Sequence, residues 1–371
     1  MRVLLINSVC GIGSTGRICT DISDELRNQG HEVRIAFGRG QVPEKYKDIA
    51  VRIGCDRDVK INALKCRLFD NEGFSAKAQT KKFLRWAEEY NPDLVWLHNL
   101  HGYYLNVGML FSWIKSRPQM KVKWTLHDCW AFTGHCSNFF VSKCTKWKTG
   151  CEHCPQKKRY PQSAFYDGSA RNYSLKKKAF CGVSEMEIIT PSQWLAGLVK
   201  ESFLKEYPIA VVHNTVDTTV FKATEKNFKK RDDLKNKIMI LGVSGVWTTE
   251  KGYRDFLKLA DRLDERFAVV LVGLTKKQME TLPKNVIGVE RTNSKEELAD
   301  IYSSADLFVN LTYSDNFPTV NLEARACGTP IVTYNTGGSP ESAGEEAEVV
   351  PTGDLDAVFE LIQKRFSDFQ E

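Results

Sequence analysis

Short apolar runs alternate with longer amphipathic stretches along most of the chain. Runs of this kind predict buried strands of a parallel sheet, because helices cover both faces of such a sheet. In the first half the expected strands are Arg2–Asn7, Glu32–Phe37, Leu94–His98, Val122–Leu126 and Glu187–Thr190. The expected helices there are Arg17–Gln29, Thr80–Glu89 and one that begins near Ser192. This alternation is typical of doubly wound βαβ folds.

A charged stretch without clear periodicity, residues 222–237, interrupts the pattern and is expected to be a linker. The pattern then restarts with the strands Ile238–Val243, Ala268–Val272, Val286–Val289, Leu307–Leu311 and Ile331–Tyr334, and with the helices Gly252–Leu263, Lys295–Ser303 and one from Thr319. We therefore predict an α/β protein with two Rossmann-like domains, residues 1–220 and 221–371. Residues from about 129 to 160 would form a cysteine-rich insertion in the first domain.

The charge is distributed unevenly between the two halves. The chain has 371 residues, enough for two full cores, and a formal net charge of +6. Residues 1–190 carry 30 Lys and Arg against 18 Asp and Glu, whereas residues 191–371 have a net charge of −6. The first half could therefore face an anionic membrane leaflet through Lys157–Arg159 and Lys176–Lys178, although a solvated surface accounts for the charge equally well. No nucleic-acid partner is expected.

The N-terminal sequence and the hydropathy predict a cytoplasmic protein. Residues 1–7 form a short strand followed by a polar loop, unlike a secretory signal. No apolar run reaches the roughly 20 residues of a membrane-spanning helix. Peripheral association with the inner face of the cell membrane is a further hypothesis from the basic first half.

Two carboxylates stand eight residues apart, Asp315 in a loop and Glu323 inside the helix expected from Thr319. They follow the strand Leu307–Leu311, and open α/β sheets bind ligands at the carboxyl ends of their strands. Free N–H groups at a helix start can hold a diphosphate. A carboxylate beside such a site suits hydroxyl donors, which indicates a sugar.

The segment Asp315–Pro330 resembles the acidic double-Glu motif of retaining family 4 glycosyltransferases. The resemblance implies the GT-B fold, two Rossmann-like domains facing an interdomain cleft. It also implies that Asp315 holds a hydroxyl of the donor sugar and that Glu323 holds the nucleotide ribose. The first position is usually Glu, so Asp315 is one methylene shorter. The resemblance also assigns the residues that follow Asp315 to donor binding, with backbone N–H groups of this segment on the diphosphate: Asn316, Phe317, Pro318 and Thr319.

Two further segments of the second half are similar to donor-binding segments of the family. Gly245–Gly252 resembles the phosphate clamp, with Lys251 in place and Val246 at the position that is usually Arg. Gly337 and Gly338, before Pro340, resemble the loop that closes over the diphosphate. Lys251 would then stabilise the charge on the leaving group.

The loop after the first strand has the spacing GxGxxG from Gly11 to Gly16. In the glycosyltransferase interpretation, Gly13 and Gly16 give space for the donor diphosphate or the acceptor. The same spacing is a dinucleotide fingerprint, and Arg39 after the second strand would then favour NADP. An NADP-dependent oxidoreductase is therefore an alternative.

Several histidines follow strands of the first half. His127 matches the family position whose His contacts the donor sugar, and a neutral His can donate to a hydroxyl or move a proton. A core histidine bonded to backbone is the alternative. His98, Asn99 and His101 resemble a feature of the capsule and colanic-acid branch of the family and are assigned to the acceptor side.

Cys136, Cys144, Cys151 and Cys154 lie close together in sequence, next to His135 and His153. In a reducing cytosol such a cluster favours a metal over disulfides, and four thiolates suit a structural Zn²⁺. Free cysteines or two disulfides are the alternatives. The aromatic residues of this insertion could dock on a membrane or pack the loop itself: Trp130, Phe132, Phe139, Phe140 and Trp147.

The combined features predict a retaining glycosyltransferase that moves a hexose-type sugar from a UDP- or GDP-linked donor to a hydroxyl acceptor. The acceptor would be a lipid-linked or growing surface-polysaccharide glycan. His127, Asp315 and Lys251 are the expected catalytic residues, and no cofactor is expected for catalysis. An inactive sugar- or membrane-binding scaffold is the second alternative, because Asp315 and Val246 depart from the family pattern.

Overall fold

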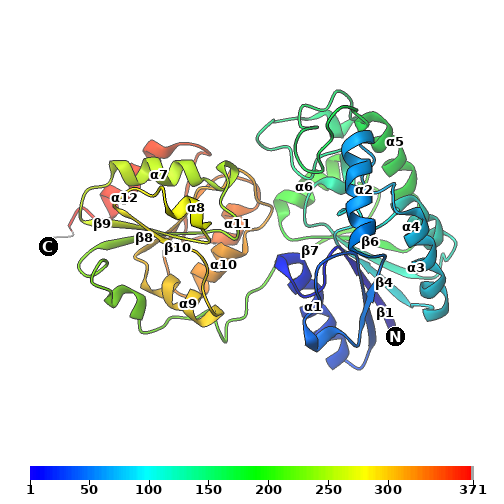
Figure 1. Cartoon of the computed structure of the whole chain (residues 1–371), viewed down its shortest axis with the longest axis horizontal. Coiled ribbons are helices and arrows are strands. Elements are labelled where there is room, and N and C mark those ends of the chain that lie inside the picture. Colours follow the sequence, from blue (N-terminus) through cyan, green and yellow to red (C-terminus); the bar gives the residue numbers. More distant parts are fainter. Residues whose placement is uncertain (369–371) are drawn as a thin grey trace. The chain divides into compact units, whose positions relative to one another are not determined.

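The computed structural model describes residues 1–368. The chain divides into two compact units, Met1–Val212 and a second unit that begins at His213 (Figure 1). Each unit contains one parallel sheet with helices packed on both faces. The doubly wound α/β fold expected from the sequence is therefore confirmed.

The first unit is built on a sheet of seven strands in the order β3-β2-β1-β4-β5-β6-β7. The strands are β1 (Arg2–Asn7), β2 (Glu32–Phe37), β3 (Ala50–Arg52), β4 (Leu94–Leu97), β5 (Lys121–Thr125), β6 (Met186–Thr190) and β7 (Ile209–Val211). The helices are α1 (Gly13–Asn28), α2 (Asp56–Phe69), α3 (Lys77–Tyr90), α4 (Val107–Lys115), α5 (Ser169–Phe180) and α6 (Gln193–Glu201). The strand order reverses between β1 and β4, which is the switch point of the sheet.

Successive side chains of β1 point to opposite faces of this sheet. Val3 and Leu5 pack in the same apolar cluster as Cys19 of α1. Leu4 and Ile6 belong to the larger cluster on the other face, which Phe83, Phe111 and Phe180 of α3, α4 and α5 complete. Both faces of the strand are therefore buried, which explains its continuous apolar sequence.

The second unit repeats the plan with six strands in the order β10-β9-β8-β11-β12-β13. The strands are β8 (Ile238–Val243), β9 (Phe267–Val272), β10 (Val286–Val289), β11 (Leu307–Asn310), β12 (Ile331–Tyr334) and β13 (Glu348–Val350). The helices are α7 (Tyr253–Arg262), α8 (Lys276–Met279), α9 (Lys295–Ser304), α10 (Thr319–Ala326), α11 (Ser339–Ala343) and α12 (Leu355–Arg365). Figure 1 shows α7 and α12 on one face of this sheet, with α9 and α10 on the other. The switch point lies between β8 and β11.

Three parts of the chain differ from the sequence-based expectations. The helices α2, α4, α5, α8 and α12 were not expected, and α1 begins at Gly13 rather than Arg17. Residues 222–237 are folded onto the second unit instead of forming an open linker. The carboxylate of Asp300 on α9 accepts hydrogen bonds from the Thr224 hydroxyl at 2.7 Å and the Phe228 N–H at 2.8 Å. The segment is therefore held on the second unit by hydrogen bonds to α9, which a pattern of apolar residues does not reveal.

Among residues 1–368, none of the helices combines the length and the apolar character needed to cross a bilayer.

Candidate functional site

The second unit places three expected donor-site segments at one edge of its sheet. Lys251 follows β8, Asp315 follows β11 and Gly337 follows β12. These strands are neighbours and parallel, so their carboxyl ends meet at the same edge. Two of them flank the switch point, which is where open α/β sheets of this kind bind their ligands.

Lys251 and Asp315 form an ion pair at this edge. The Lys251 Nζ lies 2.6 Å from Oδ2 of Asp315 and 3.4 Å from the carbonyl oxygen of Ser314. Lys251 ends a short 3₁₀ helix, η5 (Thr249–Lys251), and the backbone N–H of Tyr313 donates to the Glu250 carbonyl at 2.8 Å. The two side chains are 36% and 24% exposed, so a ligand in solvent can reach both groups.

Gly337 makes the closest approach to the Asp315 loop. Its φ is +59°, and a Cβ atom at this position would lie 1.8 Å from the carbonyl oxygen of Asp315. The N–H of Gly338 donates to the same carbonyl at 3.3 Å. Only glycine permits both the left-handed backbone and this contact. The glycine pair therefore fixes the position of the Asp315 loop.

Two of the backbone amides expected to hold a diphosphate are engaged within the loop itself. The Phe317 N–H donates to Oδ1 of Asp315 at 3.2 Å, and the Gly338 N–H donates to the Asp315 carbonyl. The His213 ring stacks on Phe317 with centroids 4.8 Å apart. In this structure these residues support the carboxylate loop.

Glu323 lies on α10 and is half-buried. Tyr302, which the sequence did not indicate, orients its carboxylate. The hydroxyl of Tyr302, on α9, donates to Oε2 of Glu323 at 2.9 Å. Tyr302 is fully buried. Burial, and then the charge of Glu323, raises the pKa of Tyr302 well above its usual range, so the tyrosine remains a donor. In the sequence Tyr302 is one more apolar position of an amphipathic helix, and its hydroxyl gives no separate signal.

A buried amide joins the two loops of this site. Asn321 of α10 is fully buried, and its Oδ1 accepts from Nδ2 of Asn310 at 2.8 Å. Its Nδ2 lies 3.0 Å from the Ser339 carbonyl oxygen and 2.9 Å from the Ser342 hydroxyl. One side chain therefore links β11, α10 and α11. In the sequence, Asn321 is only one more position between the two carboxylates, and nothing marks its amide as buried.

The glycine loop of the first unit follows β1. Gly11 has a φ of +69°, and its N–H donates to the Gly16 carbonyl at 3.1 Å. A Cβ atom on Gly16 would lie 3.2 Å from the Gly11 nitrogen, so Gly16 allows close packing of the loop on α1. A Cβ atom on Gly13 would meet nothing within 4 Å, so Gly13 faces open space.

His98 and His127 lie together after β4 and β5. Nδ1 of His98 is 3.1 Å from Nε2 of His127, and the rings stack with centroids 5.4 Å apart. Burial lowers the pKa of His98 well below its usual range. Burial also lowers the pKa of His127 to about 4, against an upward effect of Asp128. His98 is only 2% exposed and packs against the ring of His127.

His101 forms a second polar group with Asp128 and Tyr160. Its Nε2 is 2.7 Å from Oδ2 of Asp128, and its Nδ1 is 2.9 Å from the hydroxyl of Tyr160. Burial alone would raise the pKa of Asp128, but the charge and hydrogen bond of His101 lower it overall. The Asp128 carboxylate accepts from Nε2 of His101, and the Tyr160 hydroxyl lies at Nδ1 on the other side of the ring. The backbone N–H of Asn99 donates to Oδ1 of Asn7 at 3.2 Å, which fixes the loop before His101.

The structure distinguishes between the two interpretations of the insertion's aromatic residues. Four of the five are buried and pack the loop itself: Trp130, Phe132, Phe139 and Trp147.

The basic cluster Lys176–Lys178 is not entirely on the surface, because Lys176 is 1% exposed. Its Nζ donates to the carbonyl oxygens of Trp130 at 2.7 Å and Thr133 at 3.1 Å. The expectation of a continuous basic surface at this cluster was wrong for Lys176.

The predicted zinc site is not supported by the positions of the side chains as they stand. Across the part of the chain that the structure describes, residues 1–368, no three His, Cys, Asp or Glu side chains are placed to hold a metal ion. All eleven cysteines are free thiols, which excludes the two-disulfide alternative in this structure.

Family comparisons identify the class of protein. Residues 15–220 match the family described as Glycosyltransferase Family 4, and residues 224–369 match Glycosyl transferases group 1. The first match covers more than half of the 371 residues, and the chain therefore belongs to glycosyltransferase family 4. This membership favours a transferase over the NADP-dependent oxidoreductase that the glycine loop also suggested.

Two curated relatives match most of the chain. The putative colanic acid biosynthesis glycosyl transferase WcaC of Escherichia coli K12 is 22% identical over 361 residues, 92% of this chain and 85% of the E. coli protein. A D-inositol 3-phosphate glycosyltransferase of Corynebacterium jeikeium is 24% identical over 355 residues, 86% of this chain and 75% of that protein.

Solved structures show the same architecture. The sucrose-phosphate synthase of Thermosynechococcus elongatus superposes with a TM-score of 0.70 at 16% identity, over 99% of this chain and 90% of that one. Anabaena Alr3699/HepE, solved in complex with UDP, has a TM-score of 0.64 at 14% identity, over 100% and 90% of the two chains. With two Rossmann-like parallel sheets, the fold is GT-B, as predicted.

The contact between Gly337 and Asp315 predicts an unequal response to two glycine substitutions. Gly337→Ala should lower the free energy of unfolding by about 1–3 kcal/mol more than Gly328→Ala. Gly328 has a similar φ of +75°, but a Cβ atom there would meet nothing within 4 Å. Denaturant titration of both variants measures the difference, and equal losses would show that the Asp315 contact has no energetic weight.

The His98–His127 pair predicts a dependence of stability on pH. The folded pKa of His127, about 4, lies below the value of about 6.5 for an unfolded histidine. Its contribution is complete above pH 6.5 and is lost as the pH falls toward 4, because the unfolded chain then binds the proton first. Between pH 7 and pH 5 the wild type should lose about 1–3 kcal/mol more stability than His127→Gln. Parallel pH profiles of the two proteins would contradict this assignment.

Proposed function

We propose that the protein is a retaining glycosyltransferase that moves a hexose from a UDP- or GDP-linked donor to a hydroxyl acceptor. The observation that carries the proposal is the contact of Lys251, Asp315 and Gly337 at the edge of the second sheet, with Glu323 on the helix that follows. The acceptor in this proposal is a lipid-linked or growing surface glycan. The similarity to an E. coli protein named for colanic acid biosynthesis supports this class of acceptor.

Each donor group has a partner of matching chemistry in the second unit. Oε2 of Glu323 accepts from the Tyr302 hydroxyl, and a carboxylate held in this way can also accept from the ribose hydroxyls. The Asp315 carboxylate would accept from a hydroxyl of the sugar. Lys251 would attract the diphosphate, and it already lies within 2.6 Å of Asp315, so sugar and diphosphate would bind side by side.

The transfer exchanges one bond at the anomeric carbon for another. The bond from this carbon to the diphosphate oxygen breaks, and a bond to the acceptor oxygen forms on the same face. The acceptor's proton passes to the departing diphosphate, so no covalent sugar–enzyme intermediate is required. Lys251 lowers the barrier because it stabilises the negative charge that grows on the diphosphate. No cofactor takes part in this chemistry.

The polar groups of the first unit are proposed to bind the sugar and the acceptor. A neutral His127 can donate to or accept from a sugar hydroxyl, and its low pKa keeps it neutral at physiological pH. Asn99 and His101 would contact the acceptor, with Asp128 holding His101 in one tautomer. His98 is a positioning residue in this proposal, since it is buried beneath His127.

The donor assignment predicts a matched pattern among four variants. With a panel of nucleotide-sugars, wild type should hydrolyse or transfer one donor and gain thermal stability from it. Glu323→Gln and Lys251→Met should each lower kcat/KM by at least about a hundredfold, because each removes a charged contact to the donor. The exposed residues Glu346 and Lys258 provide the control variants Glu346→Gln and Lys258→Met, which should behave as wild type.

Binding of a donor without turnover would support the alternative of an inactive sugar-binding scaffold. Wild-type activity in Glu323→Gln and Lys251→Met would remove both residues from the site.

We further propose that the first unit docks on an anionic membrane through residues 157–166. Phe165 and Tyr166 are 78% and 50% exposed, and Lys158 and Arg159 beside them are also exposed. The Nζ of Lys157 donates to the Phe165 carbonyl at 3.2 Å, so basic and aromatic groups form one patch. Such a patch combines attraction to anionic headgroups with insertion of apolar rings.

Co-sedimentation with vesicles tests this docking surface. Wild type should bind vesicles of phosphatidylglycerol and phosphatidylethanolamine and should not bind phosphatidylcholine alone. The double variant Phe165→Ser with Tyr166→Ser should bind at least about tenfold more weakly than wild type. The control Val349→Ser, at an exposed residue of the second unit, should bind as wild type. Equal binding of the two variants would refute the patch.

A further inference from the structure

The segment between β5 and α5, residues 126–168, has almost no regular secondary structure. It contains only two short 3₁₀ helices, η2 (Trp130–Phe132) and η3 (Lys146–Lys148). Loops longer than about 15 residues without secondary structure of their own are uncommon in compact domains. Some other interaction must therefore hold this segment in one conformation.

Aromatic packing holds one side of the segment. The rings of Phe139 and Trp147 stack with centroids 5.0 Å apart, and Phe132 and Trp147 are 5.2 Å apart. The Trp147 indole N–H donates to the Cys144 carbonyl at 3.1 Å, and the Thr133 hydroxyl donates to the Cys136 carbonyl at 2.6 Å. These contacts fix the backbone next to two of the four clustered cysteines.

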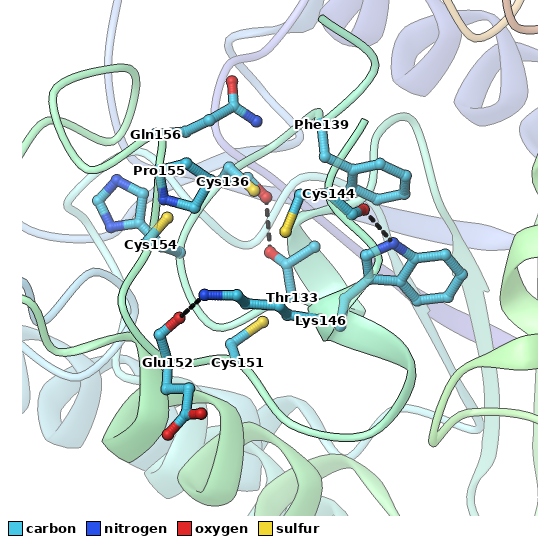
Figure 2. A pocket seen from close by; sticks show the side chains of 12 residues that line it. Thr133, Cys136, Phe139, Cys144, Lys146, Cys151, Glu152, Cys154, Pro155 and Gln156 are labelled. Carbon is cyan, nitrogen blue, oxygen red and sulfur yellow. Dashed lines mark hydrogen bonds between the residues drawn. The ribbon is translucent and has the colours of Figure 1, made fainter. Parts of the chain in front are cut away.

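The four cysteines of the segment line one small space. Cys136, Cys144, Cys151 and Cys154 all border the same pocket, and Figure 2 shows their sulfur atoms on different sides of it. The centre of a water-sized sphere can occupy about 10 Å³ of this pocket, which is room for about one water molecule or one ion. Cys136 and Cys154, 18 positions apart in sequence, therefore border one space that has room for an ion.

A backbone N–H donor and two lysine side chains lie around this pocket. The backbone N–H of Gly134 points at Sγ of Cys151, with the two atoms 3.2 Å apart. Lys146 borders the pocket and is anchored by the carbonyl oxygen of Glu152 at 3.0 Å. The Nζ of Lys176 is held inside the fold by the carbonyls of Trp130 and Thr133. A zinc ion with four thiolates carries a net charge of −2, and two nearby ammonium groups would offset it.

We propose that Cys136, Cys144, Cys151 and Cys154 bind one structural Zn²⁺. Zinc prefers four tetrahedral ligands at about 2.3 Å from sulfur, so rotations of these side chains about their Cα–Cβ bonds must bring the sulfurs inward from their present positions. Each thiol releases its proton to solvent on binding. Four protein ligands fill the coordination sphere, so the ion has no open position for catalysis.

A neighbouring histidine is placed to support the zinc site rather than to complete it. His135 also borders the pocket, and its Nδ1 lies 2.6 Å from Oδ1 of Asp70. Among residues 1–368, no hydrogen-bond partner lies within normal distance of its Nε2. The four thiols satisfy zinc without it, and the Asp70–His135 pair then anchors the segment to the end of α2.

The zinc site would determine the shape of the proposed acceptor side. The segment begins directly after His127 and Asp128, and Tyr160 lies six residues after Cys154. Tyr160 contacts His101 at 2.9 Å, and His101 contacts Asp128. Asp128 lies before the cysteines and Tyr160 after them. The proposed ion would therefore fix the distance between these two partners of His101.

Metal analysis of the purified wild-type protein tests the proposal without any variant. Protein prepared without chelators should contain about one zinc per chain by mass spectrometry of its metals. Exchange with Co²⁺ should give the sulfur-to-cobalt charge-transfer absorption and the visible bands of tetrahedral cobalt. Less than about one zinc in ten chains, both as purified and after incubation with Zn²⁺ and a reductant, would overturn the proposal.

Two serine variants locate the ligands. Cys151→Ser and Cys154→Ser should each lower zinc content and the cobalt–thiolate absorption at least about tenfold. Cys55→Ser, at an exposed cysteine outside the segment, should retain both. Equal loss in Cys55→Ser, or two disulfides found among the four cysteines by mass spectrometry, would also overturn it. The outcome is independent of the donor assignment, because none of these readouts measures glycosyl transfer.

Discussion

The reversal of strand order in each sheet is the constraint on which the proposed sites depend. In the first unit it separates β1 from β4, and in the second it separates β8 from β11. Connections on the two sides of such a point leave toward opposite faces, and open α/β sheets bind their ligands at the carboxyl ends of the strands there. The glycine loop, the histidine pair and the Lys251–Asp315 pair all follow strands at or next to these points. The order of the strands therefore determines which loops lie near the switch points, independently of the side chains in those loops.

The sequence was sufficient to predict the central strands and the GT-B architecture. Strands such as β1 and β8 are buried on both faces, and this leaves a continuous apolar run that few other elements produce. Short edge strands such as β3 and β13, three residues each, carry no comparable signal. The helix α2 was missed because its exposed face carries apolar residues, including Leu64 and Phe69, which obscure the periodicity.

The sites were less predictable than the fold, because their details depend on contacts between distant segments. Sequence similarity indicated Glu323, but not the buried Tyr302 hydroxyl that orients it from another helix. Charge counting placed Lys176 on the surface, whereas its ammonium lies 3.5 Å from the centre of the Trp130 ring. A buried lysine and an exposed lysine are identical in sequence, and only the packing around them decides which is found.

The hydrogen bonds of Asn321 have a mechanical consequence. A single amide bonds directly to Asn310 at the end of β11 and to Ser339 and Ser342 of α11. These hydrogen bonds connect the end of β11, before the carboxylate loop, rigidly to α11, after the glycine loop. A displacement of either loop would be transmitted to the other, so the two would respond to a ligand as one body.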